Sequence, residues 1–232
     1  MSLLLPESLQ REFKGILFDL DGTLLESERL HYNAFVQAME EFGYNFEEIA
    51  KNFPVEGNFR ELFRKVAGKL KFSDEQYETI YERKMEITLT TPAGEIDKID
   101  GVFSFLEYIF ETGIPMGVVT NSDREYAENT LSIHDMSQYF SELITANDLL
   151  NPKPAPDGYL KGAELLNVNP NDIIVFENTD TGISAAKAAG MSVIAIRFTD
   201  VSGTSTYDEA DHAVDSFADS SIDELRWVSL GV

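Results

Sequence analysis

Four short runs of apolar residues recur along the chain, and each ends in polar side chains. The runs lie at residues 15–24, 115–120, 172–177 and 192–197. Nearly continuous apolar runs of this length are typical of strands that are buried on both faces of a parallel sheet. Helical patterns lie between them, one ending at Gly113 and an Ala-rich one from Gly182 to Gly190. This alternation predicts right-handed βαβ units, and so an α/β fold with a doubly wound parallel sheet.

Residues 26–93 break this alternation, because their apolar patterns are helical. One apolar stripe runs from Leu30 to Phe42, and a second runs from Phe59 to Leu70. The stretch Ser73-Asp-Glu-Gln76 has the spacing of a capping box, which predicts that a third helix begins there. We therefore predict a core domain of residues 1–25 and 94–232, with a small helical domain of residues 26–93 inserted after the first strand.

The charge of the chain restricts the partners that it can have. Its 232 residues include 41 acidic and 18 basic ones, which gives a formal net charge of −23, and there is no cysteine. A surplus of carboxylates repels phosphate backbones and anionic membrane surfaces, so we expect neither nucleic acid nor a membrane as a partner. Without cysteine the chain can form no disulfide and no thiolate metal site.

No segment of the sequence resembles a targeting or membrane-spanning element. The apolar stretch from Met1 to Leu5 is too short for the core of a signal peptide, and no run approaches the roughly 20 apolar residues that span a bilayer. We therefore expect a cytoplasmic protein. A monomer is expected, with a dimer as the alternative.

Polar side chains follow the predicted strands, at the edge of an open α/β sheet where ligands bind. They are Asp19 and Asp21 after the first run, Thr120, Asn121 and Ser122 after the second, Glu177 and Asn178 after the third, and Lys153 in a Pro-rich loop. Carboxylates directly next to Ile-Leu-Phe are costly without a cation or hydrogen-bond donors, which disfavours simple capping by Asp19 and Asp21. The alternatives are a turn hydroxyl for Thr120 and an exposed loop lysine for Lys153.

Together these groups support phosphoryl transfer. Two or three carboxylates bind a hard cation such as Mg²⁺, which takes oxygen ligands. A hydroxyl, main-chain N–H groups and a lysine can hold a phosphoryl group. With one carboxylate as nucleophile and another as proton shuttle, the set is suited to transfer through an aspartyl-phosphate.

Four motifs, in this order, resemble those of the haloacid dehalogenase superfamily, and specifically its phosphatase and β-phosphoglucomutase-like branch. They are Asp19-Leu-Asp-Gly-Thr-Leu-Leu-Glu-Ser-Glu-Arg-Leu-His31, Val118-Val-Thr-Asn-Ser122, Lys153-Pro-Ala-Pro-Asp157, and Val175-Phe-Glu-Asn-Thr-Asp-Thr-Gly182 with Ala185-Ala-Lys-Ala-Ala-Gly-Met191. The motifs span nearly the whole chain. The resemblance implies a Rossmann-like core with an inserted α-helical cap domain, and a hydrolase that acts on a small phosphorylated metabolite.

The resemblance also implies catalytic roles for individual residues. Asp19 would attack phosphorus, and Asp21 would protonate the leaving oxygen and then activate the hydrolytic water. Thr120, with the main chain at Asn121, would bind phosphoryl oxygens, and Lys153 would neutralise the charge that Asp19 and the phosphoryl group share. The dehalogenase branch lacks a carboxylate at the position of Asp21, so phosphoryl chemistry is expected rather than carbon–halogen cleavage.

The resemblance implies Mg²⁺ as the cofactor, bound by the Asp19 side chain, the Asp21 carbonyl and a side chain of Glu177 or Asn178. The chain departs from the family pattern here, because that pattern has Glu-Asp where this chain has Glu177-Asn178. An amide oxygen can bind Mg²⁺ but brings no charge, so weaker metal binding is expected unless Glu177 or Asp180 substitutes. Three interpretations follow: a working site, a weakened enzyme, or a ligand-binding protein without turnover.

The helical insert matches the family's cap, which would close over the site and contact the substrate. Gly57 and Arg60 resemble the substrate-specificity loop of sugar-phosphate members, with a solvated helix face as the alternative for Arg60. Glu56 stands where the mutase has Lys, which disfavours a second phosphate site. His31 matches a family His that faces Asp21, with a helix-surface histidine as the alternative.

We therefore predict a Mg²⁺-dependent phosphatase for a small phosphorylated metabolite, with a sugar phosphate as the expected class. The first alternative is a β-phosphoglucomutase-type enzyme, which needs two phosphate sites and an aspartyl-phosphate that survives water. The second is a catalytically silent ligand-binding protein on the same fold, for which Asn178 is the sequence support.

Overall fold

The computed structural model describes residues 5–45, 49, 59–91, 96–197 and 206–228. Its central feature is a six-stranded parallel sheet with the order β4-β3-β2-β5-β6-β7. The strands are β2 (Gly15–Phe18), β3 (Met116–Val119), β4 (Glu142–Ile144), β5 (Ile173–Glu177), β6 (Ser192–Ile196) and β7 (His212–Val214). The predicted parallel sheet is confirmed. The two strands that the apolar pattern did not predict, β4 and β7, are the edges of the sheet.

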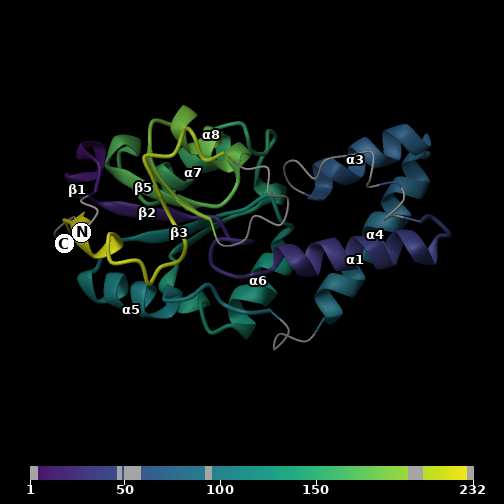
Figure 1. Ribbon diagram of the computed structural model, residues 1–232, viewed down its shortest axis with the longest axis horizontal. Coiled ribbons are helices and arrows are strands. Elements are labelled where there is room, and N and C mark those ends of the chain that lie inside the picture. Colours follow the sequence, from purple (N-terminus) through teal and green to yellow (C-terminus); the bar gives the residue numbers. More distant parts are fainter. Residues whose placement is uncertain (1–4, 46–48, 50–58, 92–95, 198–205, 229–232) are drawn as a thin grey trace.

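Helices cover both faces of the sheet, as Figure 1 shows. One face carries α5 (Val102–Thr112) and α6 (Arg124–Ile133), and the other carries α7 (Asp157–Leu165) and α8 (Asp180–Ala188). The short 3-10 helices are η1 (Glu7–Leu9), η3 (Ser137–Tyr139), η4 (Ala146–Asp148), η5 (Pro170–Asp172) and η6 (Ile222–Glu224). Within the described part of the chain, no helix combines the length and the apolar character needed to cross a membrane.

The central strand β2 is buried along its whole length because helices pack on both sides of it. Ile16 pairs with Met116 of β3 on one side and with Ile174 of β5 on the other. Since side chains alternate between the faces of a strand, Ile16 and Phe18 join the apolar cluster beneath α5 and α6. Leu17 joins the cluster beneath α7 and α8. The apolar run therefore carries the side chains of two cores, which is why it shows no alternation with polar residues.

Three further helices, α1 (Glu28–Glu41), α3 (Phe59–Leu70) and α4 (Asp74–Thr90), form a separate group beside the sheet (Figure 1). Ser73 forms the predicted capping box at the start of α4: its hydroxyl accepts from Gln76 N, and the Gln76 side chain accepts from Ser73 N. The group encloses an apolar cluster of its own, which includes Phe35, Met39, Phe63, Val66 and Ile80.

Two segments connect this helical group to the sheet, and they are paired with one another. Glu26 N donates to the carbonyl of Asp97 at 2.8 Å. Leu25 and Lys98 form an antiparallel bridge beside that bond. The helices are thus attached through a short paired ribbon, in which torsion changes at a few residues can move the whole group.

The first and last strands of the chain form a small second sheet. β1 (Glu12–Phe13) pairs in parallel with β8 (Arg226–Trp227). Phe13 is fully buried, and its ring centroid lies 6.3 Å from that of Trp227. Figure 1 places this sheet at the end of the molecule opposite the helices α1, α3 and α4. This small sheet therefore stabilises the end of the core that lies away from the helical group.

Gly101 provides a test of the packing between α5 and the C-terminal segment. The residue has a left-handed backbone (φ 76°), and a Cβ there would lie 2.5 Å from the main-chain nitrogen of Ala218. We expect Gly101→Ala to lower the free energy of unfolding by about 2–5 kcal/mol, because about 1–2 kcal/mol of backbone strain adds to about 1–3 kcal/mol of overpacking. Unfolding in denaturant, followed by circular dichroism, measures the loss.

Gly43→Ala is the matched control for this prediction. Gly43 has a similar left-handed backbone (φ 82°), but no described atom lies within 4 Å of a Cβ built there. Only the backbone strain of about 1–2 kcal/mol is expected in that variant. Equal losses in the two variants would contradict the close approach of Gly101 to Ala218.

Candidate active site

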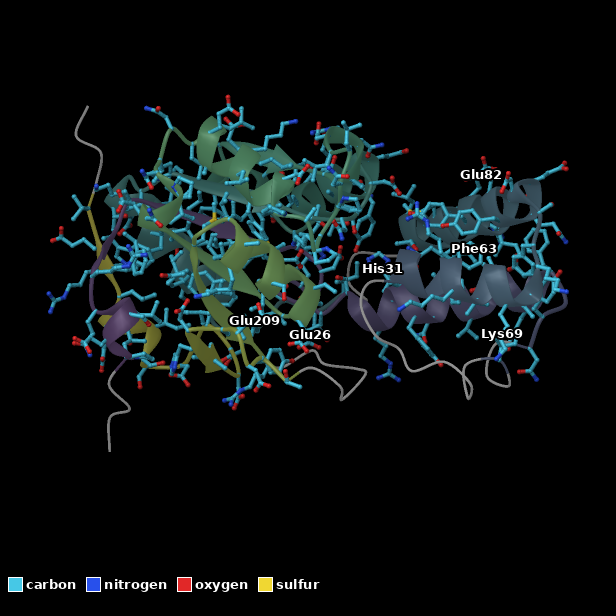
Figure 2. The ribbon with its side chains drawn as sticks, turned by 90° about the horizontal axis from the view of Figure 1, so that it is seen from above. Glu26, His31, Phe63, Lys69, Glu82 and Glu209 are labelled. Carbon is cyan, nitrogen blue, oxygen red and sulfur yellow. The ribbon has the colours of Figure 1, made fainter. Side chains whose placement is uncertain are left out.

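All but one of the polar residues predicted at the strand ends line one pocket between the sheet and the helices α1, α3 and α4; the exception is Asn178. The sheet side of the pocket includes Asp19, Asp21, Thr120, Asn121, Lys153 and Glu177. The helical side contributes His31, Phe35, Phe63, Tyr81, Lys84 and Met85. Figure 2 shows His31 at the boundary between the two parts, with Phe63 farther into the helical group.

Lys153 links the two carboxylates that follow β2 and complete β5. Its Nζ lies 2.6 Å from Asp19 Oδ1 and 2.7 Å from Glu177 Oε1, and all three residues are buried. Burial alone would lower the pKa of Lys153, but the two carboxylates raise it well above its ordinary value. Lys153 is therefore a buried ammonium group, and the alternative of an exposed loop lysine is excluded.

Both oxygens of the Glu177 carboxylate accept hydrogen bonds from neighbouring residues. Its Oε1 accepts from Lys153 and from Tyr159 OH at 3.1 Å. Its Oε2 accepts from the main-chain N–H groups of Asn178 at 2.8 Å and Thr179 at 2.9 Å, and from the Thr179 hydroxyl. Because both oxygens are already satisfied, this geometry disfavours Glu177 as a metal ligand.

Asp19, the predicted nucleophile, keeps one oxygen available. Oδ1 accepts from Lys153, whereas Oδ2 accepts no hydrogen bond from any described residue. Burial raises the pKa of Asp19 well above its ordinary value; Lys153 lowers it, but the charges of Glu177 and Asp21 raise it again. The positive charge of Lys153 alone therefore does not balance the negative charges of Asp19, Glu177 and Asp21. A second cation at this end of the pocket would favour the anionic, nucleophilic form of Asp19.

Asp21 is surrounded by hydrogen-bond donors from two segments of the chain, 27–31 and 122–126. Its Oδ1 accepts from Ser27 Oγ, from His31 Nε2 at 3.0 Å and from Tyr126 OH at 2.9 Å. Its Oδ2 accepts from Ser122 Oγ at 2.6 Å. Burial works to raise the pKa of Asp21, but His31, Ser122 and Ser27 outweigh it and hold the pKa well below its ordinary value. Asp21 is therefore an ordered, ionised carboxylate.

A buried lysine of α4, which the sequence pattern did not single out, completes this network. Lys84 Nζ lies 2.9 Å from His31 Nδ1, so a neutral ring accepts from the ammonium and donates from Nε2 to Asp21. Burial and the charge of Lys84 lower the pKa of His31, which favours the neutral ring. Burial lowers the pKa of Lys84 itself to about 8.

A signal for Lys84 was present in the sequence. On α4 it lies four residues after Ile80 and four before Thr88, and all three are buried on one stripe. A lysine on an otherwise buried stripe indicates a partner for its charge. No comparable signal exists for Tyr126, because an aromatic residue on a buried helix face is ordinary core.

Thr120 and Asn121 follow β3 and offer different groups to the pocket. Thr120 Oγ1 accepts from Ser122 N at 3.0 Å, and its own hydroxyl proton goes to no described acceptor. The Asn121 side chain holds the main chain of Lys153, because Oδ1 accepts from Lys153 N at 3.2 Å. The main-chain N–H of Asn121 donates to no described residue. A hydroxyl proton and an N–H group are thus available where a phosphoryl group is expected.

The donor set fits a cation that is bound partly through water. In the described part of the chain, no three His, Cys, Asp or Glu side chains form a metal site. The candidate oxygens are Asp19 Oδ2 and the Asp21 carbonyl, together with Asn178 Oδ1, which accepts from Thr23 Oγ1 at 3.5 Å. A carboxylate, a carbonyl, an amide and several waters suit Mg²⁺. Asp180 does not substitute, because it accepts from the main chain of the segment 206–207.

Two predicted substrate contacts lie outside this geometry. Gly57 is not among the described residues. Of Arg60 only the main-chain position in the first turn of α3 is described. Both therefore stay predictions.

Comparisons with known proteins agree with these motifs. The family model described as haloacid dehalogenase-like hydrolase matches residues 16–196. One relative is the validoxylamine A 7'-phosphate phosphatase of Streptomyces hygroscopicus subsp. limoneus, which is 29% identical over 94% of this chain and 99% of its own length. Another is the fructose-1-phosphate phosphatase YqaB of Escherichia coli, 27% identical over 82% of this chain and 99% of its own length.

A solved structure shares the fold over most of the chain. The crystal structure of CbbY from Rhodobacter sphaeroides in complex with phosphate has a TM-score of 0.75 and 24% identity, and the match covers 92% of this chain and 99% of that one. The matched family region contains the strand ends that supply Asp19, Thr120 and Glu177 to one pocket, and the loop that supplies Lys153. The chain therefore belongs to the haloacid dehalogenase-like hydrolase family, in its phosphatase and β-phosphoglucomutase-like branch, as its motifs predicted.

Proposed function

We propose that this chain, a phosphoric monoester hydrolase, is a Mg²⁺-dependent phosphatase that hydrolyses a small sugar phosphate through an aspartyl-phosphate. The observation that carries the proposal is the contact of 2.6 Å between buried Lys153 and Asp19, whose second oxygen is available, beside an ordered Asp21. One pocket thus holds a nucleophile, a positive charge for the phosphoryl group and a separate carboxylate for proton transfer. A relative named for fructose 1-phosphate supports the sugar phosphate class.

The first step would transfer the phosphoryl group to Asp19. Its Oδ2 attacks phosphorus, and the bond to the leaving oxygen breaks as Asp21 donates a proton to that oxygen. A phosphate dianion in the pocket raises the proton affinity of Asp21, which opposes the low pKa set by its donors. Lys153, the Thr120 hydroxyl and the Asn121 N–H would balance charge on the phosphoryl oxygens.

The second step would hydrolyse the aspartyl-phosphate. Asp21, now a carboxylate, takes a proton from a water molecule that attacks phosphorus, and inorganic phosphate leaves as Asp19 is restored. General acid–base catalysis of this kind contributes about 10²–10⁴ in rate. His31 and Lys84 would keep the Asp21 carboxylate in place for both steps.

Mg²⁺ would be held by the Asp19 side chain, the Asp21 carbonyl and the Asn178 amide, with water completing the shell. When bound, the ion would supply positive charge that favours anionic Asp19 and neutralises the phosphoryl group. Because Asn178 contributes no charge, the proposal includes weaker Mg²⁺ binding than a carboxylate at this position would give.

We assign residues 1–25 and 94–232 to a core domain and residues 26–93 to a cap domain. The helices α1 and α4 bring His31 and Lys84 to Asp21, so the position of the cap would decide whether the acid–base network is complete. The paired ribbon at Glu26 and Asp97 would serve as the hinge. Closure of the cap would also exclude bulk water from the pocket.

Asp19→Asn tests the nucleophile. We expect this variant to lose phosphatase activity by at least about 1,000-fold, because the amide cannot form the phosphoenzyme. Release of inorganic phosphate from p-nitrophenyl phosphate and from a panel of sugar phosphates, with Mg²⁺, Mn²⁺ or Co²⁺, measures the activity. Chelation of the metal should abolish the wild-type rate.

Asp223→Asn is the control, since it makes the same substitution at an exposed aspartate that does not line the pocket. It should retain most of the activity. If wild type releases no more phosphate than Asp19→Asn with any of these metals and esters, the phosphatase proposal is wrong, and a ligand-binding role becomes the better interpretation.

Asn178→Asp tests the amide as a metal ligand. The added charge is expected to lower the Mg²⁺ concentration for half-maximal activity by about tenfold, equivalent to about 1.4 kcal/mol of binding free energy. Asn178→Ala, which removes the oxygen altogether, should raise that concentration. Mg²⁺ titrations of the initial rate compare the three proteins, and an unchanged Mg²⁺ requirement in both variants would rule out Asn178 as a ligand.

Lys84→Met tests the link from the cap to Asp21. With a pKa of about 8, Lys84 is protonated below that pH and loses its proton as the pH rises through it, so wild-type kcat should fall on the alkaline side. Charged or titratable groups around Lys84 are His31 on α1, Asp21 after β2 and Asp123 before α6. The Lys84→Met variant should lower kcat by about 10- to 100-fold, less than the full acid–base contribution of about 10²–10⁴ because Asp21 itself is kept, and it should remove this alkaline decline.

Lys69→Met is the control for that pH profile. Lys69 is exposed on α3, and Figure 2 shows it well away from His31. Its pH–rate profile should match that of wild type. An alkaline decline that persists unchanged in Lys84→Met would assign the titration to another group.

A further inference from the structure

Asp123 is the N-cap residue of α6, yet its side chain does not cap the helix. An aspartate at this position normally accepts a hydrogen bond from an N–H group of the first helical turn. Here the main-chain N–H of Arg124 donates to Asn147 Oδ1 at 2.8 Å instead. The Asp123 carboxylate lines the pocket. Helix capping therefore does not explain why an aspartate stands at this position. Its contacts in the pocket are the other explanation.

Tyr81 of α4 holds the Asp123 carboxylate from the opposite side of the pocket. Its hydroxyl donates to Asp123 Oδ2 at 2.9 Å, and Oδ1 accepts no hydrogen bond from a described residue. The Tyr81 ring lies parallel to those of Phe63 and Tyr77, with interplanar angles of 13° and 4°. One carboxylate oxygen is thus fixed by a packed side chain, and the other can accept from a ligand.

Both lysines of the described pocket lining already have partners. Lys153 is paired with Asp19 and Glu177, and Lys84 donates to His31 and interacts electrostatically with Asp21 and Asp123. A phosphate held beside Lys153 would extend its leaving group toward the helical side of the pocket, where the Tyr81 hydroxyl contacts Asp123. A second phosphate or a carboxylate on that leaving group would meet a carboxylate in a partly dry site, where like charges repel strongly.

Besides His31 and Lys84, the described residues on the helical side of the pocket form an apolar wall. They are Phe35, Phe63, Tyr81 and Met85. Aromatic rings pack well against the C–H groups of a sugar or polyol, and a carboxylate oxygen accepts from its hydroxyl groups. An uncharged, hydroxyl-bearing leaving group therefore satisfies both the apolar wall and Asp123.

On the basis of the phosphatase function proposed above, we propose that Asp123, positioned by Tyr81, selects phosphate monoesters with an uncharged, hydroxyl-bearing leaving group. The same carboxylate excludes esters that carry a second phosphate or a carboxylate. A phosphosugar mutase has to bind a bisphosphate, so this selection also favours hydrolysis over the mutase alternative.

Two esters that differ in one group test the selection. Sorbitol 6-phosphate ends in a CH₂OH group where 6-phosphogluconate has a carboxylate, and both compete with p-nitrophenyl phosphate for the pocket. The measured quantity is the ratio of their inhibition constants, 6-phosphogluconate over sorbitol 6-phosphate, during p-nitrophenyl phosphate hydrolysis. We expect a ratio of at least about 10 for wild type and a fall of about tenfold in Asp123→Asn, because the amide removes the repulsion.

Two further variants separate the role of Asp123 from general effects of charge and folding. Tyr81→Phe removes only the hydroxyl that fixes the carboxylate, and it should lower the ratio by a smaller factor than Asp123→Asn. Glu125→Gln removes one negative charge from the same helical turn at an exposed position, and it should leave the ratio unchanged. Thermal unfolding of each variant checks that it is folded.

The outcomes separate this inference from the phosphatase proposal. If wild type hydrolyses p-nitrophenyl phosphate but binds the two esters equally well, or if Asp123→Asn keeps the wild-type ratio, the selection by Asp123 is refuted and the phosphatase stands. If wild type hydrolyses no ester above the Asp19→Asn background, the phosphatase proposal fails, and this inference fails with it.

Discussion

The buried contact between Lys153 and two carboxylates is the interaction on which both the pocket and the centre of the sheet depend. Lys153 is 134 residues from Asp19 and 24 residues from Glu177 in the sequence, so the ammonium joins β2, β5 and the loop before α7. Removing one partner of such a buried pair typically costs about 3–5 kcal/mol, because the other charge is left uncompensated. The polar cluster is tolerated inside an apolar sheet because Glu177 is also satisfied by Tyr159 and by two main-chain N–H groups.

A second network, around Asp21, depends on the helical group as much as on the sheet. Tyr126 and Ser122 approach Asp21 from the β3–α6 region, whereas His31 comes from α1 and is supported by Lys84 of α4. The two networks line different sides of the same pocket. Lys153 and its partners need only the sheet, but Asp21 has its full set of donors only when α1 and α4 lie against the sheet.

This difference explains which residues the sequence could predict. Asp19, Thr120 and Lys153 follow from local patterns, since parallel strands end at one edge and bring their following residues together. Tyr126 was missed because its contact depends on how α6 packs on other elements. The periodicity of α4 places Lys84 on a buried stripe, but it does not specify which partner the lysine meets. The edge strands β4 and β7 were missed for a related reason: each has only one buried residue, so neither gives a continuous apolar run. Glu177 was predicted as a possible metal ligand from its position alone, and its hydrogen bonds, invisible in the sequence, favour a structural role.

A net charge of −23 is expected to repel a phosphate ester, but the groups that line the pocket offset this repulsion locally. Charges on the surface are screened by salt over about 8–10 Å, so the field inside a pocket is set mainly by the groups that line it. At one end Lys153, the Thr120 hydroxyl and the Asn121 N–H are all donors, whereas at the other Asp123 offers only acceptor oxygens. With a bound cation balancing Asp19 and Glu177, such a pocket would distinguish the two ends of its ligand, because the anionic end would be stabilised at Lys153 and repelled at Asp123.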